Sequence, residues 1–270
     1  MSNWLLIFYR DWLVHIVHRL KLELLKQRYL HIDETHVQVL KEPGRKNTSD
    51  SYMWVYCSIR DAVNPIRYFE YQPGRSGKYP EAFLREYEGY IHTDAYSGYN
   101  AVSGVKRCLC YTHLRRAFVD ALPPDQKKKE RLIREKPLLE AFWSWAEKSA
   151  IGELPKSKLS KAFHYALNNR EGFWNYLEDG NCSISNSLAE NCIRPFVIGR
   201  KNWLFSGSPK GAEASAGIYT LVETAKANGL APMKYIKYIL SDMPGSAFLE
   251  HPEYLDDYLP WNPLVKEFCR

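Results

Sequence analysis

The first stretch of the chain alternates apolar and polar residues with the period of a helix. Arg10, Asp11 and Arg19 interrupt it, no basic region precedes it, and no small-residue cleavage site follows it, which argues against a signal peptide or a membrane span. The pattern therefore predicts an amphipathic helical lead-in over residues 1–28. Its apolar positions are Leu5, Phe8, Trp12, Ile16, Leu20 and Leu24.

From Tyr29 onward the apolar pattern becomes that of strands. Tyr29–Asp33 is predicted to be a short strand with an acid at its end. Two aromatic-rich and β-branched segments, 52–59 and 66–71, are predicted to be the next strands, with turn residues between them. Three strands joined by short links predict an antiparallel meander.

A helix and two more strands are predicted after the meander. Proline in the first turn and Gly89 just past the end predict a helix over 80–87. A short strand then ends at Asp94, and a second one over 105–111 leads into a helix that begins near His113.

The segment from 123 to about 180 has a different, helical character. It carries large aromatic side chains, which we interpret as core residues, and is predicted to be a helical insertion. It also holds a basic run that is either a solvated face or a nucleic-acid contact. The run consists of Lys127, Lys128, Lys129, Arg131 and Arg134.

The C-terminal third is predicted to return to compact structure. Ser187-x-x-Glu190 matches a capping box, so a short helix is predicted there, stopped by Pro195. Two further helices are predicted over 212–228 and 232–240. The proline-rich tail 243–270 is predicted to be loop-like.

Composition and charge are compatible with several classes of globular protein and do not by themselves select one. The chain has 270 residues, 45% of them hydrophobic, and a net charge of +6, which suits a polyanionic partner without selecting one. Six cysteines are present, but no C-x-x-C pair occurs, so their spacing predicts neither a zinc site nor a disulfide framework. A reducing compartment is the resulting expectation.

Candidate chemistry lies in three acids. Asp33 and Asp94 are the last residues of two similar tripeptides, His31-Ile32-Asp33 and His92-Thr93-Asp94, at the ends of two predicted strands. Glu190 lies in a later predicted helix. This order of elements predicts a ribonuclease-H-like α/β fold, a mixed sheet flanked by helices. Three converging carboxylates need a divalent cation, and oxygen ligands suit Mg²⁺ or Mn²⁺. The alternatives are that the aspartates are turn residues and that Glu190 closes the capping box.

Several long segments show a family resemblance over nearly the whole chain. The chain resembles the C-terminal catalytic part of the insertion sequence 66 family, a group of DDE transposases. The matching segments are 30–35, 51–54, 92–99, 113–118, 189–210, 221–230 and 259–263.

The resemblance implies a function and a set of site residues. Asp33, Asp94 and Glu190 would be the catalytic, metal-binding triad for two Mg²⁺ (or Mn²⁺) ions, with Asp33 bridging both. The reaction would be hydrolysis at a transposon end to free a 3′ hydroxyl, followed by attack of that hydroxyl on target DNA. The candidate DNA contacts, each equally well explained by a salt bridge, are His113, Arg115, Arg116, Arg194, Arg200 and Lys201.

The resemblance also implies an organisation and a set of partners. DNA at the transposon ends and the target, a homo-oligomer on DNA, no membrane, and a bacterial cytoplasmic location at the nucleoid are expected. The expected segments are a lead-in (1–28), the core's first part (29–120), the insertion (121–182), the core's second part (183–242) and a tail (243–270).

The sequence departs from the family pattern in two places. Family members usually carry a longer N-terminal region, so we expect a truncated copy, whose alternative is a catalytically incompetent DNA-binding remnant. Ser185, Asn186 and Ser187 stand where the family often has an acid and two asparagines, which leaves the triad intact but can loosen the groups that support it.

Overall fold

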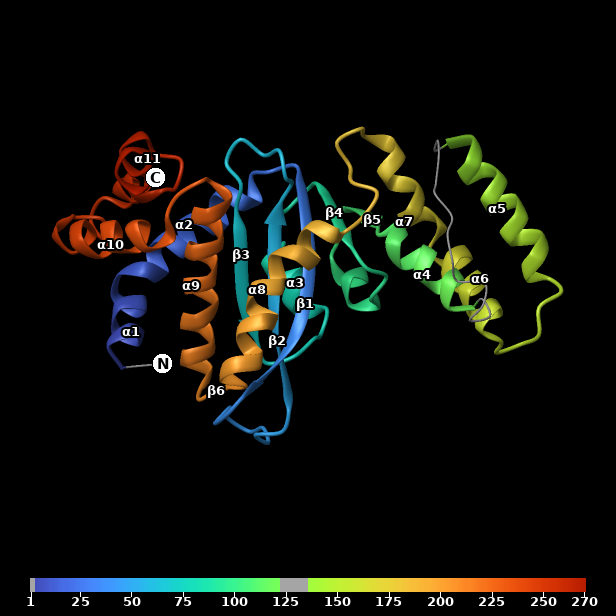
Figure 1. Ribbon diagram of the computed structural model, residues 1–270, viewed down its shortest axis with the longest axis horizontal. Coiled ribbons are helices and arrows are strands. Elements are labelled where there is room, and N and C mark those ends of the chain that lie inside the picture. Colours follow the sequence, from blue (N-terminus) through green and yellow to red (C-terminus); the bar gives the residue numbers. More distant parts are fainter. Residues whose placement is uncertain (1–2, 122–135) are drawn as a thin grey trace. The chain divides into compact units, whose positions relative to one another are not determined.

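The computed structural model describes residues 3–121 and 136–270, which form two compact units of mixed α/β structure (Figure 1). Among these residues, the first unit holds four strands and the second unit two. The first unit comprises the chain up to Gly89, Ser97–Val105 and Ser187–Arg270; the second comprises Tyr90–Tyr96 and Lys106–Asn186.

The N-terminal lead-in is helical, as predicted. It consists of α1 (Asn3–Phe8), a π-helical turn η1 (Tyr9–Leu13) and α2 (Val14–Leu25). The buried side chains of α2 recur at helical spacing: Ile16, Val17, Leu20 and Leu24. In the part of the chain that the structure describes, no helix combines the length and apolar character that a membrane crossing requires.

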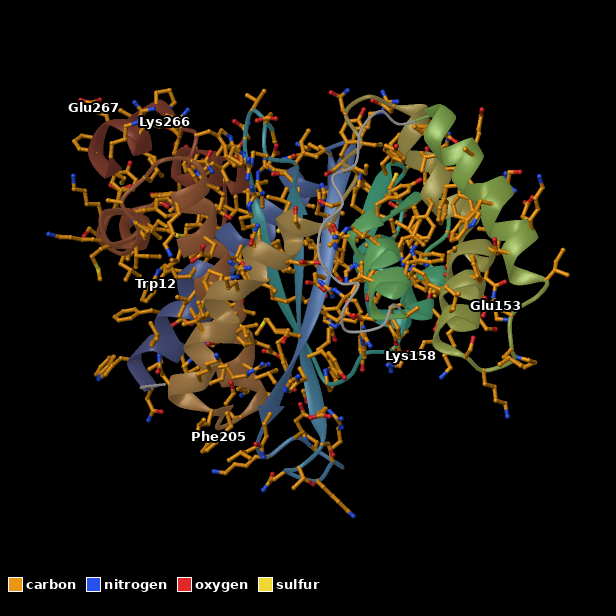
Figure 2. All side chains as sticks on the ribbon, turned by 45° about the vertical axis from the view of Figure 1, so that its right-hand side comes forward. Trp12, Glu153, Lys158, Phe205, Lys266 and Glu267 are labelled. Atoms are coloured by element: carbon orange, nitrogen blue, oxygen red, sulfur yellow. The ribbon has the colours of Figure 1, made fainter. Side chains whose placement is uncertain are left out.

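The sheet of the first unit confirms the predicted meander. β1 (Tyr29–Val39), β2 (Asp50–Ser58) and β3 (Arg67–Gln72) pair antiparallel in sequence order. A two-residue strand, β6 (Phe205–Ser206), pairs parallel with the end of β1, so the sheet is mixed. Phe205, labelled in Figure 2, lies beside the C-terminal end of β1.

Asp33 does not end its strand, and that prediction is wrong. β1 runs six residues further, to Val39, and Asp33 pairs with Val55 in its middle. The pairing with β2 extends without a break to Gln38, and Val37 and Val39 are fully buried. This continuous ladder and burial outweigh the low strand propensity of the acids at 33 and 34.

Two helices cover one face of this sheet. α8 (Ser187–Trp203) crosses β1 and β2, and α9 (Pro209–Ala227) lies along β3 (Figure 1). The Thr220 and Thr224 hydroxyls of α9 accept hydrogen bonds from β3 backbone N–H groups at 2.8 and 3.1 Å, which protects the edge strand. The buried core here contains Val37, Val39, Met53, Val55, Cys57, Phe69, Tyr71, Ala189, Ile193, Phe196, Ala212 and Ala216.

Pro195 lies inside α8 rather than at its end, so the prediction that it stops the helix is wrong. The missing N–H deprives the Asn191 carbonyl of its helical bond, but Asn191 is exposed to water. Ile193 and Phe196 are buried in the core on either side of the proline. Burying two such side chains is worth about 3–6 kcal/mol, which offsets the proline's cost of about 3 kcal/mol.

The opposite face of the sheet packs against a shorter helix. α3 (Lys78–Phe83) begins earlier and ends earlier than predicted, since Leu84 leaves helical geometry and Glu86 has a positive φ of 66°. The Phe83 ring stacks on Tyr56 of β2 at 3.6 Å between ring centroids. The turn η2 (Ser97–Ala101) contacts α3.

The tail is ordered, which corrects the prediction of a loop. After α10 (Pro232–Asp242) come η5 (Met243–Gly245), η6 (Pro252–Tyr258) and α11 (Pro263–Cys269). Each of these elements has proline in its first turn, where the missing N–H has no helical partner to lose. The prolines therefore start helices here instead of breaking them.

The second unit joins a parallel strand pair to a helical layer. β4 (Tyr90–Thr93) pairs with β5 (Lys106–Leu109), and the helices are α4 (Tyr111–Ala121), α5 (Lys136–Ala150), α6 (Lys158–Asn168), α7 (Arg170–Trp174) and η4 (Asn175–Glu178).

The insertion's described part is helical, as predicted, and buries Trp143, Phe163 and Phe173. Glu153 and Lys158 mark the connection between α5 and α6 (Figure 2). The basic run over 127–134 lies outside the described residues.

Candidate functional site

Asp94 directly follows β4, as predicted, and its loop is held by an arginine of the neighbouring strand. The Asp94 Oδ1 atom accepts a hydrogen bond from the Tyr96 N–H at 3.0 Å. Arg107 donates to Thr93 Oγ1 at 2.8 Å and to the carbonyl oxygens of Asp94 and Tyr96 at 2.6 and 2.9 Å. Sequence reasoning missed Arg107, whose available signal was a charged residue inside a predicted strand.

Asp94 opens onto a pocket of about 320 Å³ in the second unit. The pocket's far wall is one face of α4, since positions 113, 116, 117 and 120 recur at helical spacing. His113 and Arg116 thus line the same pocket as Asp94. Arg115 is exposed but lies outside the lining, because it is about 200° around the helix from His113.

Tyr165 of α6 also lines this pocket, and sequence reasoning missed it. Burial raises the pKa of its hydroxyl to about 12, and the negative charge of Asp94 adds to the shift. Tyr165 therefore stays protonated at neutral pH and is a hydrogen-bond donor on the wall of the pocket. Its position among the insertion's aromatic residues carried no signal that separated it from the core.

His113 is tied to Cys110, the residue just after β5. Burial alone would raise the pKa of the Cys110 thiol, but hydrogen bonds from the His113 side chain and from backbone N–H groups lower it overall. One of those N–H groups belongs to Asn186, at 3.2 Å from Cys110 Sγ. The hydrogen bond between the His113 side chain and Cys110 holds the imidazole that lines the pocket.

Asp33 and Glu190 belong to the first unit. Asp33 Oδ1 accepts a hydrogen bond from the Glu34 N–H at 2.9 Å. Strand alternation puts Asp33 on the same face as Val37, which is the face that α8 covers. Glu190 lies in the first turn of α8, so both acids are on one side of the sheet; Ser187 is the first residue of this helix.

Glu34, the neighbour of Asp33, points to the opposite face and has a structural role. Its side chain is 2% exposed and forms an ion pair with Arg75 at 2.6 Å. The Tyr99 hydroxyl donates to the same carboxylate, and the Tyr99 ring packs edge-on against Trp54. Two residues of the family-like segments, Glu34 and Tyr99, thus stabilise the fold.

The three basic candidates on α8 separate into two groups. Arg200 donates to Thr35 Oγ1 at 3.1 Å and to the His36 carbonyl, so it fastens α8 to β1. Arg194 and Lys201 are exposed, and both lie within about 40° of Glu190 around the helix axis. They form an exposed basic stripe beside the acid.

Each of the three acids offers donor atoms that suit a hard divalent cation. Asp33, Asp94 and Glu190 are all half-buried, and carboxylate oxygens are the donors that Mg²⁺ and Mn²⁺ prefer.

A family model described as "Transposase IS66 family" matches residues 1–130 and 121–214, and one described as "IS66 C-terminal element" matches 220–261. No solved structure matches the chain.

Three relatives come from Sinorhizobium fredii (strain NBRC 101917 / NGR234). Uncharacterized protein y4hP is 24% identical over 86% of this chain and 50% of its own length, and uncharacterized protein y4qI is 27% identical over 85% and 50%. Uncharacterized protein y4jD is 24% identical over 93% of this chain and 57% of its own length. The chain thus spans about half the length of these curated relatives. With family models matching most of its length, the chain belongs to the IS66 family of transposases.

Proposed function

We propose that this chain is the catalytic part of a metal-dependent DDE transposase with a ribonuclease-H-like core. The observation that carries the proposal is the pocket in which the Asp94 carboxylate lies beside His113 and Arg116. An acid for a cation and basic side chains for phosphate are the two components that phosphodiester chemistry needs side by side. The family match supports the same assignment.

In this proposal Asp33, Asp94 and Glu190 hold two Mg²⁺ or Mn²⁺ ions. When bound, such ions would supply activation of an attacking oxygen and stabilisation of a leaving oxygen in an in-line displacement at phosphorus. The products are a free 3′ hydroxyl at the transposon end and, after strand transfer, a joined target strand.

The chain's other residues position the acids and the DNA. Arg107 fixes the Asp94 loop through the Asp94 and Tyr96 carbonyls, which keeps the carboxylate oriented toward the pocket. Arg116 is exposed at the pocket and pairs with a DNA phosphate through its planar fork. Arg194 and Lys201 provide further phosphate contacts, whereas Arg200 is assigned to docking α8.

The test is metal-dependent nicking and joining of labelled DNA by the purified chain. Asp94→Asn should lower the nicking rate about 100-fold or more, since a fixed electrostatic group at such a site is worth this much. Asp61→Asn is the matched control: it makes the same change of a carboxylate to an amide at an exposed position in the turn after β2, and it should leave the nicking rate unchanged. Equal nicking by wild type and Asp94→Asn in Mg²⁺ and Mn²⁺ would exclude the proposed site.

The same experiment distinguishes the proposal from the alternative of a catalytically incompetent DNA-binding remnant. A remnant binds DNA in a salt-sensitive way but gives no metal-dependent cleavage with either ion. Retained binding with no nicking by the wild type would establish that alternative.

A further inference from the structure

Three soft donor side chains converge in the second unit, apart from the carboxylates described above. His92 and Cys108 are directly paired in the parallel strands β4 and β5, so their side chains lie on the same face. Cys182 comes from the segment after η4. One potential ligand atom of each residue lies within 4.8 Å of the other two.

We propose that His92, Cys108 and Cys182 bind one Zn²⁺ ion. Two thiolates and an imidazole are a donor set that selects zinc over Mg²⁺, which prefers oxygen. Tetrahedral zinc with bonds of about 2.3 Å to sulfur and about 2.0 Å to nitrogen requires ligand atoms about 3.5–3.8 Å apart. Side-chain adjustments of about 1 Å bring the observed cluster to this geometry.

Burial and charge around the cluster favour a bound cation. His92 is 1% exposed and Cys108 is fully buried, so two ligands are shielded from water. Burial raises the pKa of the Cys108 thiol, and the neighbouring Cys182 and then the charges of Glu178 and Asp179 add to the shift. A divalent cation compensates the thiolate charge that this environment otherwise disfavours.

The loop that carries Cys182 is already held over the strand pair. The Ser183 N–H donates to His92 Nε2 at 2.9 Å, and the Cys182 N–H donates to the Asp179 carbonyl at 2.9 Å. Coordination through Nε2 would replace the Ser183 hydrogen bond by a metal bond. Cys182 is half-buried, which provides an entry path and leaves a fourth position for water.

Zinc at this site would join the segment after η4 to β4, two residues before Asp94. The ion would therefore stabilise β4, the strand that leads into Asp94. It is independent of the proposed transposase chemistry, since it uses none of the three carboxylates.

The test is spectroscopic titration of the full-length, reduced, metal-stripped chain with Co²⁺ in excess Mg²⁺. The Mg²⁺ occupies oxygen-ligand sites, so a sulfur-to-cobalt charge-transfer band reports thiolate ligation alone. One equivalent of Co²⁺ should saturate the band, and Zn²⁺ should abolish it. Absence of the band in the wild type would overturn the proposal.

Variants then assign the ligands. Cys182→Ser should weaken Co²⁺ affinity by at least about 100-fold, because even residues that only orient a metal ligand are worth about 10- to 100-fold. Cys192→Ser, at the other half-buried cysteine, is the matched control and should bind as the wild type does. Equal weakening by both variants would overturn the assignment.

A measurement on the wild type guards against misfolded variants. Zn²⁺ should slow alkylation of Cys108 and Cys182 by iodoacetamide at least about 10-fold and leave Cys192 unchanged, as read by peptide mass spectrometry. Unchanged alkylation of all three thiols at saturating Zn²⁺ would contradict the site.

Discussion

Arg107 fixes the loop around Asp94 through one side-chain and two carbonyl acceptors. Hydrogen bonds from a charged donor are worth about 1.5–3 kcal/mol each, and the three share one guanidinium. Arg107→Ala should therefore lower the free energy of unfolding by about 2–4 kcal/mol, measured by urea denaturation, and reduce nicking with it. Arg107→Lys keeps the charge but lacks the planar guanidinium, so its free energy of unfolding should lie between those of the wild type and the alanine variant. An unchanged urea midpoint in the alanine variant would contradict this role.

Arg115 and Arg116 are adjacent, exposed arginines on α4, and only Arg116 lines the Asp94 pocket. They therefore form a matched pair with the same change in net charge. Arg116→Ala should reduce the nicking rate about 10-fold or more, since it removes a charge-assisted phosphate contact next to the reacting group. Arg115→Ala should stay within about 3-fold of the wild type. The measurement is the nicking rate at saturating DNA, and equal losses would refute a special position for Arg116.

Glu70 of β3 gives a prediction about pH. Burial raises the pKa of its carboxyl above the ordinary 4.5, although the charge of Lys21 acts in the opposite direction. A raised folded pKa means that the stability contributed by neutral Glu70 is complete below pH 4.5 and is lost as pH rises through the folded pKa.

Glu70→Gln should therefore be more stable than wild type at neutral pH and indistinguishable from it below pH 4.5, in urea denaturation at both pH values. Glu88→Gln, at an exposed position between α3 and β4, controls for the substitution itself and should show the same small difference at both pH values. A Glu70→Gln advantage that persists in acid would contradict the burial argument.

At the scale of elements, α8 keeps a proline that costs it a hydrogen bond. Pro195→Ala should restore the bond to the Asn191 carbonyl and stabilise the fold by about 1–2 kcal/mol, the helix gain of about 3 reduced by the entropy that the unfolded chain regains. Pro209→Ala changes a proline at the start of α9, where no bond is missing, and should not stabilise. Thermal unfolding of both variants distinguishes them, and a stabilised Pro209→Ala would argue against this explanation.

Asp33 in β1 and Pro195 in α8 show which features of the fold can be predicted from the sequence. Periodicity predicted the lead-in, the meander and the helical insertion, because burial repeats within each element. It misplaced the end of β1, the end of α8 and the order in the tail, because those depend on partners far away in the chain. Nothing near Asp33 reveals that β2 continues opposite it, and nothing near Pro195 reveals how firmly Phe196 is buried.

The candidate site was predictable only in part, for the same reason. Asp94, His113 and Arg116 carried family-like neighbours, and the structure brings them to one pocket. Tyr165 had no local signal, and Arg107 had only that of a charged residue inside a predicted strand, since their roles arise from α6 and β5 packing beside Asp94. The cluster of His92, Cys108 and Cys182 was missed because its members come from three separate segments. Metal-binding sequence motifs detect only ligands that are close together in the sequence.

At the scale of the whole molecule, neither unit is continuous in sequence. The chain passes between them at 89–90, 96–97, 105–106 and 186–187, so Asp94 belongs to one unit and Glu190 to the other. The five predicted segments remain a prediction drawn along the chain, whereas the compact units group residues by contact. The four-residue strand β4 thus belongs to the same compact unit as α5, which begins more than forty residues later in the sequence.

Net charge is also a property of the whole molecule, and it must be separated from local contacts. The chain carries +6, so any loss of two cations leaves +4 and weakens DNA binding non-specifically. The logarithm of affinity falls with the logarithm of salt concentration with a slope of about −0.9 per neutralised phosphate. If Arg194 and Lys201 each contact a phosphate, replacing both by alanine should make the slope less steep by about 1.8.

The control is a double alanine variant of Lys234 and Lys237, two exposed lysines of α10 in the same unit. It removes the same charge from a helix that carries none of the proposed contacts. Its affinity should fall slightly at low salt while its slope stays that of the wild type, because screening weakens the general field without releasing bound counterions. Fluorescence anisotropy with a labelled duplex over a salt series measures both slopes. Identical slopes for the two double variants would mean that the stripe beside Glu190 acts only through total charge.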